Sequence, residues 1–207
     1  MNDDIPVTMI HTRKIRLDVK NPRFGHLDLK SDIKKSEELL QSEIEGEPDT
    51  IKLFKDIKRE GVEDPIRVQE TVDGEYVVWE GNRRTTCLKK LLREGITESA
   101  DGISFEKVRA HVYPASYSKV KIEVLKGRLQ TGKKGWGASN ISKYISGLRH
   151  EHLLDMEDIA IAMQLPVVRV KEHIENWELF KEYALDQNHT DTNQFSYFQE
   201  APKIWEK

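Results

Sequence analysis

The segment Glu80-Gly81-Asn82-Arg83-Arg84 combines residue types that are suited to holding a phosphate group. Its glycine allows a tight backbone turn and a close approach of a ligand. A helix that starts just after it would present unpaired N–H groups and a positive dipole end to an anion. Arg83 and Arg84 add forked donors, and Thr85 adds a hydroxyl. The segment therefore predicts a phosphate-binding turn, with an ordinary strand–turn–helix carrying surface arginines as the alternative.

This turn requires a strand before it and a helix after it. Residues 76–79 predict the strand, and residues 83–94 predict a helix with Cys87 on its apolar inner face. A partner strand is expected over residues 66–70. Between the two strands, Asp73-Gly74 favours a tight primed hairpin turn, because this pair tolerates positive φ angles.

The remaining pattern divides the chain near residue 115. Before that point we expect strands over 14–19 and 108–113, helices over 31–44 and 50–60, and a poorly ordered lead-in over 1–12. After it, only helices are expected, over 118–129, 139–150, 156–163 and 166–183. The predicted fold class is therefore α+β: a small mixed sheet with helices in a domain of residues 1–115, followed by an all-helical domain of residues 116–207.

The order and spacing of the motifs over about residues 14–113 resemble the N-terminal domain of the ParB/sulfiredoxin superfamily. That family has an early N-P-R element, a G-V-x-x-P-I-x-V strand, a G-x-Y-x-V strand and a G-E-R-R loop. The corresponding segments here are Asn21-Pro22-Arg23 and residues 61–68, 74–78 and 80–84.

The resemblance implies nucleotide binding. In ParB-like proteins the G-E-R-R loop binds nucleotide phosphates, commonly those of CTP, and Gly81, Arg83 and Arg84 match it. Arg23 is a second expected contact. Asn82 replaces the usual acid, which leaves CTP specificity and hydrolysis open. The expected cofactor is thus CTP or ATP, with Mg²⁺ as a candidate companion.

Enzymes of the same superfamily offer alternatives. Sulfiredoxin has a reactive cysteine in the equivalent loop, but Cys87 lies about one turn into the helix, so this reductase chemistry is not expected. Related kinases use a glutamate as base, which makes Glu80 a candidate, with an ion pair to the neighbouring arginines as the alternative. No cluster of carboxylates or histidines suggests a catalytic metal.

The charge distribution points to a local anionic partner. The chain has 33 Lys and Arg against 36 Asp and Glu, a net charge of −3. Residues 118–150 nevertheless contain eight Lys or Arg and one acid, so this stretch is +7 and the rest is −10. A solvated basic face is the alternative.

Residues 128–136 lie within the basic stretch and resemble an R-x3-G-x3-W arrangement of ParB-like proteins outside the chromosome-segregation group. By this resemblance Arg128 is a candidate phosphate ligand. Lys133 and Lys134 are candidates for neutralising DNA phosphates. An exposed basic loop is the alternative.

Residues 158–174 are typical of a helix–turn–helix, with Ala160 allowing close helix approach and Pro166 able to start the second helix. On this reading Arg169, Lys171 and His173 face a DNA groove or its phosphates. A structural helix pair is the alternative, and the nearby Glu172 and Glu175 weaken DNA contact.

Three functional hypotheses follow: a nucleotide-switched DNA-binding protein, an enzyme such as an NTPase, kinase or nuclease, and an interaction module of a larger protein. A homodimer is the family expectation. No apolar run is long enough to span a bilayer, and a cytoplasmic location without membrane partners is expected. The aromatic residues after position 194 predict either that the end of the chain packs back on the protein or that the chain is a fragment of a longer protein.

Overall fold

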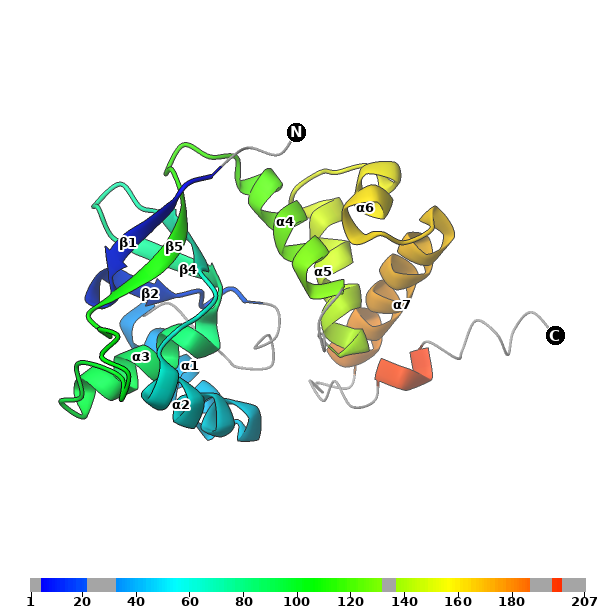
Figure 1. Cartoon of the computed structure of the whole chain (residues 1–207). Helices are drawn as coiled ribbons and strands as arrows, with labels where there is room; N and C mark the ends of the chain where they lie inside the picture. The colour runs from blue at the N-terminus through cyan, green and yellow to red at the C-terminus, as the bar shows by residue number, and fades with distance from the viewer. Residues whose placement is uncertain (1–4, 22–32, 132–136, 187–194, 199–207) are drawn as a thin grey trace. The chain divides into compact units, whose positions relative to one another are not determined.

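The computed structural model describes residues 5–21, 33–131, 137–186 and 195–198. They form two compact units, which divide after Tyr117. The first unit combines a five-stranded sheet with helices, and the second is helical (Figure 1). The predicted fold class, α+β followed by an all-helical region, is confirmed.

The sheet of the first unit is mixed. Its strand order is β1-β5-β3-β4-β2. The β1–β5 and β3–β4 pairs are antiparallel, whereas the β2–β4 and β3–β5 pairs are parallel. The strands are β1 (Val7–His11), β2 (Ile15–Leu17), β3 (Ile66–Glu70), β4 (Tyr76–Glu80) and β5 (Lys107–Tyr113).

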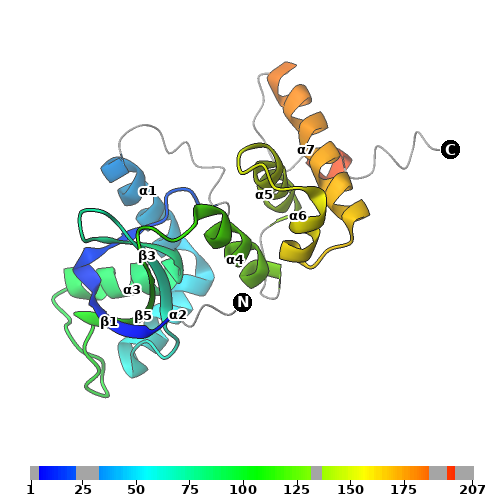
Figure 2. The same ribbon diagram turned by 90° about the horizontal axis from the view of Figure 1, so that it is seen from above.

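Three helices cover one face of this sheet: α1 (Ile33–Gly46), α2 (Pro48–Glu60) and α3 (Asn82–Arg93). They lie beneath the strands in Figure 1, and Figure 2 shows α3 behind the strands when the unit is seen from above. Alternate strand residues point toward these helices and are buried with apolar helix residues. This core includes Ile15, Leu17, Ile66, Val68, Val78, Val108, Ala110, Leu40, Ile44, Ile57, Leu88 and Leu91.

Two local expectations in the first unit were wrong. Residues 7–11 are not part of a poorly ordered lead-in but form β1, an edge strand that pairs with β5. This strand lacks a clear apolar alternation, because Val7 and Met9 are exposed and only Ile10 is buried. The β3–β4 connection is a five-residue loop in which Gly74 alone has a positive φ, of 75°, so it is not a primed turn.

The second unit contains α4 (Lys119–Thr131), α5 (Ala138–His150), α6 (Met156–Met163) and α7 (Val167–Asp186). No strand occurs among its described residues. Gly127 lets α4 approach α6 closely, since a Cβ there would lie 2.5 Å from the sulfur of Met163. The core of the unit includes Tyr144, Ile145, Leu148, Ile159, Met163, Val170 and Ile174.

The aromatic residues near the chain end pack against α7, as predicted for those that the structure describes. Phe195 is buried, with its ring centroid 5.6 Å from that of Phe180 and 6.0 Å from that of Trp177. Phe198 contacts Phe180 and Tyr183. Within the described residues, no helix has the length and apolarity required to cross a membrane.

Candidate phosphate-binding site

The turn between β4 and α3 requires glycine at position 81. Gly81 has a φ of 107°, in the left-handed region, and precedes the first residue of α3. A Cβ at this position would lie 2.6 Å from Cγ2 of Ile66. The carbonyl of Gly81 accepts the first helical hydrogen bond, from the N–H of Thr85 at 2.9 Å. The N–H groups of the preceding helical residues lack helical acceptors, as in any helix start.

Asn82 joins this helix start to the end of β2. Its side chain is buried, and its Oδ1 atom accepts a hydrogen bond from the N–H of Asp18 at 3.1 Å. Asp18 in turn accepts hydrogen bonds from the N–H groups of Lys20 and Asn21. The turn that leads into the N-P-R element is thereby held at the start of α3. Arg23 itself lies outside the described residues.

Arg84 acts as a cross-link inside the turn. Its Nη2 atom lies 2.7 and 2.9 Å from the two carboxylate oxygens of Glu80, and its Nη1 atom donates to the carbonyl of Asp64 at 2.7 Å. The Arg84 and Glu80 side chains are only 16% and 13% exposed. Both carboxylate oxygens of Glu80 therefore bond to the guanidinium of Arg84. This ion pair is the alternative that the sequence offered to a role of Glu80 as a catalytic base.

Arg83, unlike Arg84, has a side chain that is accessible to a ligand. Its side chain is 40% exposed, and the ion pair to Asp49 is long, at 4.0 Å between Nη1 and Oδ2. Such an exposed pair contributes only about 0–1 kcal/mol, so an incoming phosphate can replace it at small cost. The two adjacent arginines thus divide into one that builds the turn and one that faces outward.

The threonines that follow are buried. Thr85 and Thr86 are both 0% exposed, and neither Oγ1 atom has a hydrogen-bond partner among the described residues. In this arrangement the Thr85 hydroxyl is not presented to solvent as a phosphate donor. Thr86 borders a cavity of about 50 Å³ that Cys87, Thr50 and Phe54 also line.

Cys87 is also buried, and its environment disfavours the thiolate. Burial, followed by the negative charge of Glu45, raises the pKa of the thiol to about 12. The sulfur lies 3.9 Å from the carbonyl of Thr50. A thiol of this kind is unreactive at neutral pH, because the thiolate is the nucleophile.

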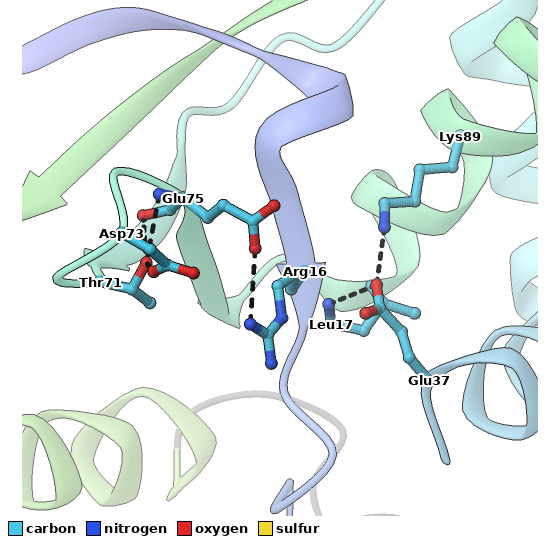
Figure 3. A network of polar contacts seen from close by, with 7 residues as sticks. All are labelled: Arg16, Leu17, Glu37, Thr71, Asp73, Glu75 and Lys89. Carbon is cyan, nitrogen blue, oxygen red and sulfur yellow. Dashed lines mark hydrogen bonds and ion pairs between the residues drawn. The ribbon is translucent and has the colours of Figure 1, made fainter. Parts of the chain in front are cut away.

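A second support for the helix start comes from α1 (Figure 3). Oε1 of Glu37 accepts hydrogen bonds from the N–H of Leu17 at 3.0 Å and from Nζ of Lys89 at 2.7 Å. The consecutive amides of Leu17 and Asp18 thus donate to side chains of α1 and α3. Sequence reasoning missed Glu37, which is one of six acids between positions 37 and 49 and carries no distinguishing local signal. Figure 3 also shows the Arg16–Glu75 ion pair, 3.4 Å long, on the other side of β2.

The candidate residues of the second unit are placed on two of its helices. Arg128 lies on α4 with an exposed side chain. Arg169 and Lys171 are exposed on α7 and pair with Glu172 and Glu175. Lys133 and Lys134 lie outside the described residues.

His173 faces α5 rather than solvent alone. It is half-buried, with Nδ1 2.7 Å from Oγ of Ser142. Burial lowers the pKa of its imidazole, and the charge of Arg169 lowers it further. The neutral ring is therefore favoured in the folded unit, which fits a packing contact better than a cationic contact to DNA.

The α6–α7 pair has the local features of two helices joined by a short turn. Asp155 caps α6 by accepting a hydrogen bond from the N–H of Asp158 at 2.7 Å. Gln164 ends α6 with a positive φ of 54°. Ala160 and Val170 are buried between the helices of the unit. No group of three or more potential metal-binding side chains occurs in the described part of the chain.

Comparisons with known proteins give distant structural likenesses. No family model and no curated protein matches the chain. A structure of C-terminally truncated ParB from Caulobacter crescentus complexed with CTP-gamma-S is 15% identical, with a TM-score of 0.40, and covers 93% of this chain and 92% of its own. The same protein complexed with the centromeric parS site is 12% identical, with a TM-score of 0.49, and the match covers 92% of this chain and 84% of that one.

Proposed function

We propose that this chain is a ParB-like nucleotide-binding and DNA-binding protein, in which the start of α3 holds nucleotide phosphates. The motif order over about residues 14–113 supports the family resemblance. The proposed site consists of Gly81, Asn82 and Arg83 of the turn. By the family resemblance, Arg23 and Arg128 are separate candidate phosphate ligands. CTP or ATP is the ligand class, with Mg²⁺ as a companion ion.

One observation carries the proposal: hydrogen bonds hold the side chains of Asn82 and Arg84 within the turn, whereas the side chain of Arg83 is partly exposed. Arg84 is fixed by Glu80 and the Asp64 carbonyl, and Asn82 is fixed by Asp18. A site whose parts are already in place loses little conformational entropy when an anion binds. Arg83, with 40% of its side chain exposed, then supplies the forked donor next to the unpaired helix N–H groups.

DNA binding is assigned to the second unit. Its α6–α7 pair carries Arg169 and Lys171 on exposed positions, and residues 118–150 of the unit form the stretch of charge +7. The paired acids Glu172 and Glu175 would have to give up these cations to phosphates. A homodimer is the proposed assembly, by the family resemblance alone.

Isothermal titration with CTP, ATP and GTP tests the proposal, each with and without Mg²⁺ and duplex DNA. We expect saturable binding of at least one nucleotide and a change in DNA affinity when it is bound. Absence of heat with every nucleotide would contradict nucleotide binding. A nucleotide that binds without altering DNA affinity would contradict the switch while leaving the phosphate site intact.

A further inference from the structure

The face of the sheet opposite α1, α2 and α3 is basic along β5. The strand Lys107–Tyr113 alternates between the two faces. Val108 and Ala110 are buried toward the helices, at 4% and 0% exposure. The intervening residues point the other way, and they are Lys107, Arg109 and His111.

Neighbouring strands extend this basic face. In the register of the sheet, Arg67 of β3 lies beside His111. Arg16 of β2 lies on the same face, in the row that runs through Val77 and Gln69 to Tyr113. We call this surface the β5 basic face and define it by Lys107, Arg109, His111, Arg67 and Arg16.

The outward positions of the five strands are Val7, Met9, His11, Arg16, Arg67, Gln69, Val77, Trp79, Lys107, Arg109, His111 and Tyr113. The one acid in register with them is Glu80, the partner of Arg67 at the β3–β4 irregularity, and both of its carboxylate oxygens bond to Arg84. Among the described residues, Arg16 alone of the three arginines here forms an ion pair, with Glu75 of the β3–β4 loop. The positive charge of the face is therefore largely uncompensated.

Two of the three guanidinium groups of the face, those of Arg67 and Arg109, are oriented by neutral partners. Arg67 Nη1 donates to the hydroxyl of Tyr113 at 3.2 Å, and Arg109 donates to the carbonyl of Glu63. The Tyr113 ring is held in turn between Trp79 and Tyr117, at centroid distances of 5.2 and 5.0 Å. Neutral partners fix the positions of these cations without cancelling their charge, which keeps them attractive to an anion.

We infer that the β5 basic face binds the phosphate backbone of a nucleic acid strand. Successive outward side chains of a strand are about 6.7 Å apart. A nucleic acid backbone offers a continuous row of phosphates, which Arg and Lys side chains contact. This inference rests on the proposed DNA-binding function. It adds a contact surface on the first unit, carried by β5 and its neighbouring strands.

The test is the salt dependence of DNA binding by the full chain, measured by fluorescence anisotropy with a labelled duplex of arbitrary sequence. The variant Lys107→Gln/Arg109→Gln removes two cations of the face. The control Lys52→Gln/Lys55→Gln removes two exposed cations of α2, on the opposite side of the sheet, and changes the net charge equally.

We expect the slope of log affinity against log salt to fall in magnitude by roughly 1.8 for the β5 variant, at about 0.9 per lost phosphate contact, and to stay unchanged for the control. Equal slopes for wild type and both variants would overturn the inference, and this is also the result expected if the face binds an acidic peptide. Failure of the wild-type chain to bind DNA at all would instead refute the proposed function on which the inference rests.

Discussion

The backbone N–H of Asp18 donates a hydrogen bond of 3.1 Å to Oδ1 of Asn82, which ties the end of β2 to the first residue of α3. Either an amide or a carboxylate oxygen can accept this bond. Asparagine at this position therefore keeps the connection without placing a negative charge beside the proposed phosphate site. Asn82, which replaces the acid in the G-E-R-R loop of ParB-like proteins, thus leaves the turn intact.

The Asn82→Asp variant tests this reading. The new carboxylate retains the bond to Asp18 but repels a phosphate, so we expect Mg²⁺-free nucleotide affinity to fall roughly tenfold, or ~1.4 kcal/mol. Titration calorimetry without and with Mg²⁺ measures the effect, which should be smaller when the cation is present. Unchanged Mg²⁺-free affinity in a folded variant would show that phosphates bind elsewhere.

Glu37 is expected to position the site through β2. Glu37→Ala removes the acceptor of the Leu17 N–H and the partner of Lys89, which loosens the strand end that precedes Asp18. We expect faster amide hydrogen exchange at Leu17 and Asp18 and several-fold weaker nucleotide binding. Hydrogen exchange followed by NMR, together with calorimetry, measures both.

Glu45→Ala is the matched control for Glu37. It also removes ion pairs between α1 and α3, here to Arg93 at 2.9 Å, but Glu45 has no bond to β2. The control should lose a similar amount of stability and retain nucleotide affinity. Equal losses of affinity in both variants would mean that Glu37 merely stabilises the helix layer.

Gly81→Ala is expected to destabilise the first unit strongly. The variant combines a φ of 107° with a contact of 2.6 Å to Ile66, and strained backbone alone costs of order 1–3 kcal/mol. Gly74→Ala provides the comparison, since its φ is 75° but no atom lies within 4 Å of the added Cβ. Urea denaturation should rank Gly81→Ala as the less stable, and the reverse order would contradict the close packing of the turn.

Cys87 should resist thiol reagents in the native protein. Its folded pKa is about 12 against a usual value of 9.0, so both folded and unfolded chains hold the proton below pH 9. As pH rises from about 9 to 12 the unfolded state loses its proton first, and the stabilising contribution of the buried thiol is lost. Labelling kinetics at pH 8 should follow unfolding, and rapid labelling of the native chain would contradict the burial.

Sequence patterns predicted the elements better than they predicted the roles of individual residues. The bounds of β3 and α6 match the expected 66–70 and 156–163, because alternation, turn residues and capping signals agree there. β1 was missed because its pairing with β5 supplies the order that its own pattern lacks.

In the candidate site, too, the sequence predicted where the turn lies but not what each of its side chains contacts. Arg83 and Arg84 are identical in type and adjacent, and only the carbonyl of Asp64 and the carboxylate of Glu80 distinguish them. Glu37 and Thr85 are further examples, since a long-range bond defines one and complete burial the other. Such roles depend on the contacts and burial of each side chain in the folded chain, which the residue types of a local motif do not specify.

The proposed function depends above all on the binding of nucleotide phosphate by Arg83 at the start of α3. Calorimetric titration of CTP and ATP into wild type, Arg83→Ala and Arg93→Ala tests it most directly. Arg93 lies at the other end of the same helix with a side chain that is 57% exposed, so its variant controls for the loss of charge. We expect Arg83→Ala to lose at least tenfold in affinity, or ~1.4 kcal/mol, and Arg93→Ala to bind like wild type. Wild-type affinity in a folded Arg83→Ala variant would contradict phosphate binding by Arg83.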